Sequence, residues 1–201
     1  MSSAVVAHGA TGAGGRRKGL GNPVLGMLLF IVSEIMFFAG LFAAYFNLRT
    51  ATGTWPPPGN GAFEIHSEIV FPAVMTTLLI VSSLTCQIAV WRIRRGDRLG
   101  MNRALLATVV LGVIFLCGQA YDYTQLGFGI KDGIFGNTFY ILTGFHGAHV
   151  LGGVLMLGVC LYRGGLGQFS AQHHDMVEAT SIYWHFVDVV WILLFTLLYV
   201  V

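Results

Sequence analysis

The sequence has few charged residues for its length. Only 10% of its 201 residues are Asp, Glu, Lys or Arg, and the formal net charge is +2, whereas soluble domains average about 25% charged residues. So small a net charge supplies no basic face that could neutralise phosphates, which excludes nucleic-acid binding. Disorder is excluded as well, because 55% of the residues are hydrophobic. The composition therefore indicates a chain whose main solvent is lipid.

Cysteine is equally scarce. The three cysteines, Cys86, Cys117 and Cys160, lie far apart, and each falls inside an apolar stretch. An odd number of cysteines without a CxxC pair offers neither a disulfide framework nor a zinc knuckle, and the sequence has no CxxCH haem-attachment motif. We interpret the three as small hydrophobic side chains.

Long apolar runs are what the sequence does contain. A bilayer core of about 30 Å needs roughly 20 helical residues, and barrel strands are much shorter and alternate in polarity. The continuous runs lie at 24–48, 69–93, 104–121, 138–162 and 179–201, and the third could extend to Leu126. The sequence thus predicts an all-α polytopic membrane protein: a bundle of five transmembrane helices over 24–201, behind a flexible cytoplasmic tail at 1–23.

The basic residues fall mostly on one side of these runs. The tail and the regions around the second and fourth connections hold nine: Arg16, Arg17, Lys18, Arg92, Arg94, Arg95, Arg98, Arg103 and Arg163. The opposite side holds Arg49 and Lys131. Because cytoplasmic loops carry the excess of Lys and Arg, we expect the N-terminus inside and the C-terminus outside.

Five ionisable residues persist within the apolar runs, although such residues cost about 2.5–3.5 kcal/mol at mid-membrane. They are Glu34, His146, His149, His185 and Asp188. At about 1.5 Å per residue, Glu34, His149 and Asp188 reach similar depths. We therefore predict that Glu34 is buried and hydrogen-bonded to a histidine of 138–162, with His149 as the first choice and His146 as the second.

Three interpretations of these five residues stay open. His146-x-x-His149 and His185-x-x-Asp188 each place two metal-ligand types on one helical face. Glu34 could belong to a proton or ion pathway. The third interpretation is that the groups pair with one another and lock the helices together. Separately, Gly144, Ala148 and Gly152 form a small-residue stripe suited to close helix approach.

Five short sequence motifs follow one another along the chain. They read SEIMFF at 33–38, SSLT at 82–85, GQAYDY at 118–123, TGFHGAHV at 143–150 and YWHFVDVVW at 183–191. In order and spacing the chain resembles subunit three of the haem-copper cytochrome c oxidases, in the short five-helix bacterial form. Asp122 departs from the pattern, because the family usually has Glu at this position.

The resemblance implies a non-catalytic core subunit of a proton-pumping terminal oxidase in the bacterial plasma membrane. In that family the haems and coppers belong to subunits one and two, while subunit three binds phospholipids and supports proton uptake and the lifetime of turnover. Glu34 falls on the family's carbodiimide-reactive carboxylate. Arg163 and His173 match positions that contact lipid head groups, and Glu178 matches an acid at the start of the last helix. The resemblance implies no metal ligand in this chain.

The resemblance leaves alternatives open. Long members of the family have seven helices, and the five-helix form also occurs in quinol oxidases, so a quinol-fed complex is the second reading. Some short forms belong to oxidases that join a cytochrome bc complex. An independent ion carrier and an intramembrane metalloenzyme remain as hypotheses of other classes. We further predict that Arg163 and His173 anchor an anionic phospholipid at the inner face.

Overall fold

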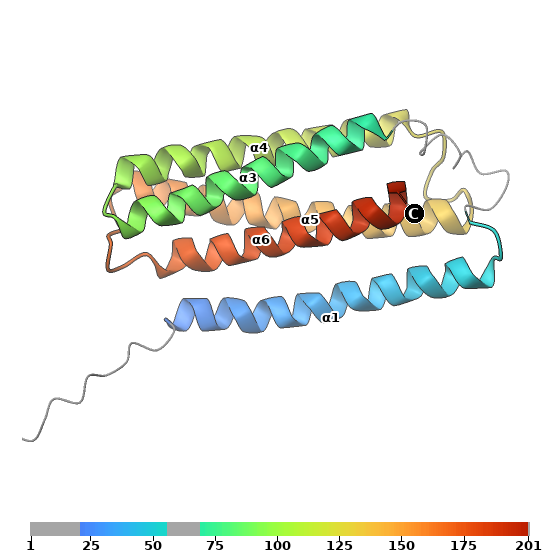
Figure 1. Ribbon diagram of the computed structural model, residues 1–201, viewed down its shortest axis with the longest axis horizontal. Helices are drawn as coiled ribbons and strands as arrows, with labels where there is room; N and C mark the ends of the chain where they lie inside the picture. Colours follow the sequence, from blue (N-terminus) through green and yellow to red (C-terminus); the bar gives the residue numbers. More distant parts are fainter. Residues whose placement is uncertain (1–20, 56–68, 201) are drawn as a thin grey trace, which may run out of the picture.

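The computed structural model describes residues 21–55 and 69–200. Long helices run side by side along one axis (Figure 1), and no strand occurs in the described residues. The elements are α1 (Asn22–Ala51), α3 (Val70–Arg94), α4 (Arg98–Gln125), α5 (Gly133–Gly165), α6 (Asp175–Phe195) and the short π-helix η1 (Thr196–Val200). The expected tail at 1–23 lies outside the described residues, except for its last positions, where α1 begins.

Among the described residues, five helices are long and apolar enough to cross a membrane, which confirms the expected number of spans. The largest difference from the expected bounds is α4, which covers 98–125 instead of 104–121. Gly96 adopts a left-handed φ of 79°, so that the chain turns directly from α3 into α4. The Asp97 carboxylate then accepts a hydrogen bond from the Gly100 N–H at 2.8 Å and caps the new helix.

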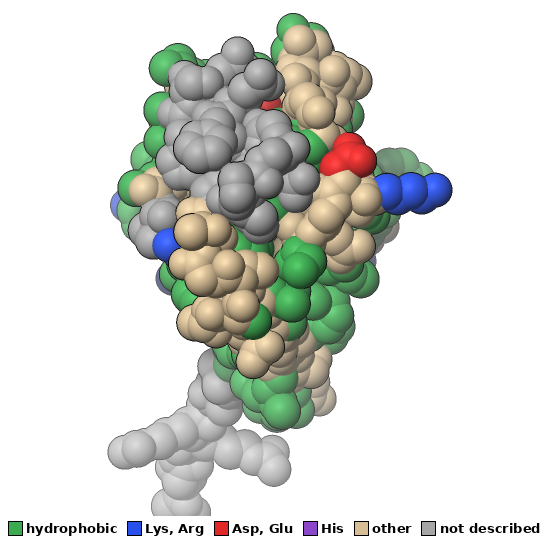
Figure 2. All heavy atoms as spheres, turned by 90° about the vertical axis from the view of Figure 1, so that its right-hand side faces the viewer, with side chains coloured by type: hydrophobic (Ala, Val, Ile, Leu, Met, Phe, Trp, Pro, Cys, Tyr) green, Lys and Arg blue, Asp and Glu red, His purple; other side chains and the backbone are tan. Residues whose placement is uncertain are grey.

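Helices α3 to α6 form a four-helix bundle, and α1 lies outside it (Figure 1). Within the bundle, neighbours along the chain are neighbours in space, and α6 also closes the ring against α3. Helix α1 packs mainly along α6 and touches α5 much less. The end of the bundle that faces the viewer in Figure 2 shows few Lys and Arg side chains.

Trp184 of α6 fills the centre of the bundle and is fully buried. A Cβ atom at Gly112 of α4 or at Gly153 of α5 would lie 2.8 Å or 2.7 Å from its ring. Glycine is therefore required at both positions if α4 and α5 are to approach α6 this closely. By contrast, Gly144 has nothing within 4 Å of its Cβ position, and Ala148 is exposed. Gly152, the third residue of the predicted stripe, lies against α6, because its Cβ position is 3.5 Å from the Tyr183 hydroxyl. The stripe therefore packs against a described helix at Gly152 but not at Gly144.

Candidate functional site

Glu34 of α1 and His149 of α5 form an ion-pair contact between the outer helix and the bundle. The Glu34 Oε2 atom lies 2.8 Å from His149 Nε2, and the side chains are 18% and 16% exposed. The His149 Nδ1 atom lies 2.6 Å from the Phe145 carbonyl oxygen, which orients the imidazole along its own helix. Phe38 packs against the same ring at a centroid distance of 4.9 Å. The predicted hydrogen bond from Glu34 to its first-choice histidine is confirmed, whereas Glu34 is half-buried instead of fully buried.

His146 points in a different direction from His149. Its side chain is fully buried, stacks on Trp191 with centroids 4.9 Å apart and meets the edge of Phe115. Neither ring nitrogen has a hydrogen-bond partner. Residues three apart on a helix differ by about 60° in direction. Here the His146 ring points into the bundle, and the His149 ring faces α1. The prediction that His146 and His149 present one ligand face is therefore wrong.

His185 of α6 is held by neutral partners and not by Asp188. Its Nδ1 atom lies 2.5 Å from Ser83 Oγ on α3, and its Nε2 atom lies 3.2 Å from both Ser181 Oγ and Gln87 Oε1. Asp188 is buried, and within the described part of the chain neither carboxyl oxygen has a hydrogen-bond partner. His185 and Asp188 therefore do not pair with each other. Of the five ionisable residues predicted within the spans, Glu34 and His149 pair with each other, and the other three do not.

No metal-ligand set forms among these side chains. Within 21–55 and 69–200, no three His, Cys, Asp or Glu residues are grouped so that they could hold a metal ion. Cys86 and Cys160 are buried and free, and Cys117 is exposed on α4.

Neutral hydrogen bonds connect α3 to the rest of the bundle. The Trp184 indole N–H donates to Ser82 Oγ at 3.0 Å, and the Trp191 indole N–H donates to Thr76 Oγ1 at 2.9 Å. Thr108 of α4 lies 2.8 Å from the Thr85 hydroxyl. The hydroxyl-rich SSLT string at 82–85 thus supplies hydrogen-bond partners to both α6 and α4.

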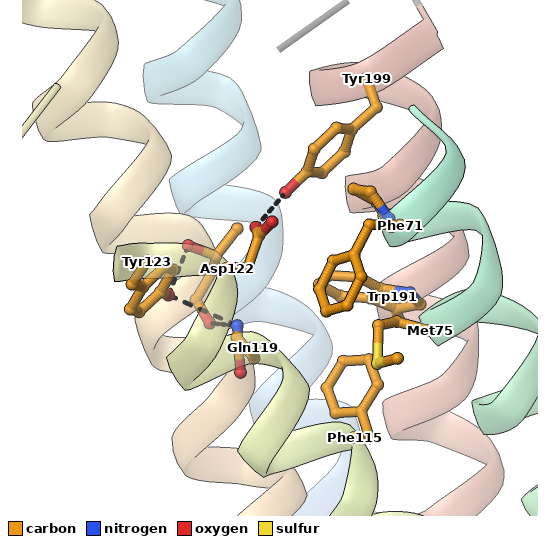
Figure 3. A pocket seen from close by; sticks show the side chains of 10 residues that line it. Phe71, Met75, Phe115, Gln119, Asp122, Tyr123, Trp191 and Tyr199 are labelled. Atoms are coloured by element: carbon orange, nitrogen blue, oxygen red, sulfur yellow. Dashed lines mark hydrogen bonds between the residues drawn. The ribbon is translucent and has the colours of Figure 1, made fainter. Parts of the chain in front are cut away.

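A small cavity lies near the end of the bundle opposite the α3–α4 turn, between α3, α4, α5, α6 and η1 (Figure 3). One wall is polar: the Gln119 amide donates to the Thr143 carbonyl at 2.9 Å, and the Tyr123 hydroxyl lies 2.7 Å from Thr143 Oγ1. The Tyr199 hydroxyl donates to Asp122 at 3.3 Å. The cavity measures about 10 Å³, close to the minimum that a water molecule needs. It is too small for an organic substrate.

The three residues matched to lipid positions lie around the α5–α6 connection. The Arg163 guanidinium donates to Gln168 Oε1 at 2.8 Å and to Met176 Sδ at 3.0 Å. It also sits 5.4 Å from the centroid of the Phe169 ring. His173 is exposed on the connection. Arg163 is thus held in place by its own connection, with its long stem beside α6.

Glu178 joins α6 to α3 by an ion pair. Its carboxylate accepts a hydrogen bond from Arg94 at 2.8 Å, and His174 Nε2 lies 3.0 Å from the same oxygen. Sequence reasoning did not single out Arg94 or His174 for this role. The i,i+4 spacing of His174 and Glu178 at the start of α6 was the available signal.

Five membrane-spanning helices, with ionisable side chains held between them by the chain's own residues, define a polytopic helical membrane protein. Within that class, the chain belongs to the family described as cytochrome c oxidase subunit III, whose model matches residues 8–201. Membership implies that the chain forms a complex with the other oxidase subunits. The family has no redox centres of its own.

Named relatives cover most of the chain. It is 44% identical over 178 residues to cytochrome c oxidase subunit 3 of Thermostichus vulcanus, covering 88% of this chain and 86% of the relative. It is 42% identical over 206 residues to the probable cytochrome c oxidase subunit 3 of Mycobacterium tuberculosis, covering 99% and 98%. The mouse subunit 3 is also 42% identical, over 87% of this chain and 67% of the mouse protein.

Proposed function

We propose that the chain is a non-catalytic core subunit of a proton-pumping terminal oxidase in a bacterial plasma membrane. In this proposal subunits one and two hold the haems and coppers, and this chain supports proton uptake and prolongs turnover. The observation that carries the proposal is the match over residues 8–201, together with relatives named as subunit 3 at 42–44% identity. The basic residues on the α3–α4 and α5–α6 connections support placing those ends in the cytoplasm.

The role of Glu34 in this proposal is to fasten α1 to the bundle. A carboxylate in hydrocarbon needs a partner, and His149 at 2.8 Å supplies one. Bound in this way, Glu34 fixes the position of α1, and α1 in turn supports proton uptake by the partner subunit. Its substitution should therefore have a milder effect than removal of the whole chain.

Phospholipid binding at the cytoplasmic end belongs to the same proposal. Arg163 is fixed beside Gln168 and Phe169, and exposed His173 lies on the same connection. A planar guanidinium suits a lipid phosphate because it offers several donors in one plane. Glu178 contributes by holding Arg94 of α3 against α6. Exchange of Arg163 for Ala should lower the phospholipid content of the purified complex.

Removal of the chain tests the proposal directly. An oxidase without it should still reduce oxygen, since the redox centres belong to the other subunits, but its rate should decay faster over successive turnovers. Proton uptake should slow further at higher pH. The measurement is oxygen consumption with and without the chain at two pH values. If removal abolishes the haem or copper content of an otherwise folded partner, the proposal is wrong.

The electron donor separates the proposal from its nearest alternative, the equivalent subunit of a quinol oxidase. The relatives named as cytochrome c oxidase subunits favour cytochrome c as the donor. A tagged chain should therefore purify with a complex that oxidises reduced cytochrome c. Co-purification with a complex that oxidises only quinol would establish the alternative. Purification of the chain without any haem protein would favour an independent ion carrier. A cytochrome bc complex in the same preparation would identify a further partner.

A further inference from the structure

The α3–α4 hairpin carries a hollow whose lining residues all come from α3, α4 and the turn between them. The hollow has a volume of about 550 Å³ and lies against the last turns of α3 and the first turns of α4. Its lining residues are Thr85, Ile88, Arg92, Asp97, Leu99, Gly100, Arg103 and Ala104. At about 1.5 Å per residue, the seven positions from Arg92 to Thr85 extend about 10 Å toward the middle of the helix. The hollow therefore runs from the end of the bundle into its membrane-spanning part.

The rim of the hollow is positively charged. Arg92 and Arg103 come from different helices, and both side chains are exposed. The Arg92 Nη1 atom donates to Asp97 Oδ2 at 3.0 Å, which holds this guanidinium at the rim. Two arginines against one aspartate leave a charge of +1 at the hollow.

Asp97 lines the same hollow as Arg92 and Arg103. The Gly100 N–H donates to its carboxylate, and together with the charges of Arg92 and Arg103 this lowers the pKa of Asp97 below its ordinary value. Asp97 therefore stays ionised at neutral pH and orders the rim without cancelling its charge.

Below the rim the hollow presents mainly apolar side chains to a ligand. Ile88, one turn deeper on α3 than Arg92, exposes a large hydrophobic side chain, and Ala104, which follows Arg103 on α4, adds a small one. The Thr85 hydroxyl is already used, because it donates to the Ser82 carbonyl at 2.8 Å and lies 2.8 Å from the Thr108 hydroxyl. The lower part therefore presents hydrocarbon beneath a cationic rim, which is complementary to a phospholipid.

We propose that the hollow binds one anionic phospholipid of single negative charge, with its phosphate between Arg92 and Arg103 and its upper acyl chains along Ile88 and Ala104. The charge of +1 matches one phosphodiester, and it favours an anionic head group over a zwitterionic one. The inference is independent of the proposed oxidase function, because it rests on the hairpin alone.

Competition between two lipids tests the site on the full chain, purified with the membrane proteins that accompany it. The preparation is exchanged into detergent with equal amounts of phosphatidylglycerol and phosphatidylcholine, and the retained lipids are quantified. The wild-type chain should retain phosphatidylglycerol in preference to phosphatidylcholine. Because each basic residue near an anionic lipid contributes a factor of about five, the variant R92Q/R103Q should lose at least about fivefold of that preference.

Two further variants make the test specific. R95Q/R98Q removes the same charge from the same connection outside the hollow, and its lipid preference should stay close to that of the wild type. Asp97→Asn keeps a good helix cap and raises the charge of the hollow, so the preference should increase about fivefold. Equal losses in both arginine pairs, or no gain with Asp97→Asn, would overturn the site. The gain expected from Asp97→Asn keeps the test decisive even if R92Q/R103Q fails to fold.

Discussion

Helices α6 and α1 are both strongly apolar, yet they are held in different ways. In the most apolar stretch of α6, 50% of the residues are buried, against 17% in that of α1. Helix α6 contacts α1, α3, α4 and α5, and its tryptophans donate hydrogen bonds to α3. Helix α1 is attached by aromatic contacts, by the Glu34–His149 pair and by the Tyr45 hydroxyl, which donates to the Leu197 carbonyl at 2.9 Å.

The difference shows that hydropathy does not identify the central helix of a membrane bundle. Lipid and a neighbouring helix are equally apolar, so an apolar side chain gains little from one over the other. What distinguishes α6 is shape: a large indole inserted between two glycines, with a hydroxyl to receive its N–H. Substitutions at the centre of α6 should therefore cost far more than substitutions where α1 meets the bundle.

The largest effect is expected for Trp184→Ala. The side chain is fully buried, and removing a buried tryptophan typically costs about 3–5 kcal/mol. Ser82 would also lose its donor. We expect a large fall in the amount of folded chain, measured by thermal unfolding in detergent. Trp91, which is 52% exposed on α3, is the matched control. A loss of similar size with Trp91→Ala would contradict the comparison.

A smaller loss is expected for Gly153→Ala. The added methyl group would lie 2.7 Å from the Trp184 ring, and overpacking of this kind costs about 1–3 kcal/mol. Gly144→Ala on the same helix has nothing within 4 Å. It should be neutral, or slightly stabilising because Ala is the better helix former. Unfolding of both variants in the same detergent gives the difference, and equal stabilities would show that the bundle adjusts freely around Trp184.

The smallest effect is expected where α1 meets α5. Polar contacts in membranes contribute about 0.6–2 kcal/mol, so a double-mutant cycle on Glu34→Ala and His149→Ala should give a coupling in this range. The measurement is the free energy of unfolding of the wild type, both single variants and the double variant. A coupling near zero would mean that aromatic packing alone holds α1. A coupling larger than the Trp184→Ala cost would reverse the order of the two regions.

The candidate site was predictable to the extent that it depended on depth along a helix. Glu34 and His149 could be matched from sequence because rise per residue is fixed, and both lie at similar distances from the ends of their spans. Rotation was harder to predict. His146 and His149 differ by about 60° around α5, and only the positions of α1 and Trp191 decide which ring faces inward.

Contacts that join distant helices were the least predictable. The Arg94–Glu178 ion pair and the Tyr199–Asp122 hydrogen bond each connect residues more than 70 positions apart in the sequence. Nothing local to Arg94 or Tyr199 distinguishes them from other boundary residues. Gly112 and Gly153 were missed for the same reason, because their role exists only relative to the Trp184 ring.

By itself, the sequence determined the lipid environment, the five spans and the family, because hydropathy and motif order are properties of single residues and their spacing. The α3–α4 turn also depends on local sequence, since Gly96 and Asp97 act on their own neighbours. Only the tertiary structure decided that α6 is central and α1 peripheral, and that His185 bonds to Ser83 while Asp188 stands apart. The physical reason is that lipid supplies no hydrophobic force between helices. Their arrangement therefore depends on the fit of side chains that lie far apart in the sequence.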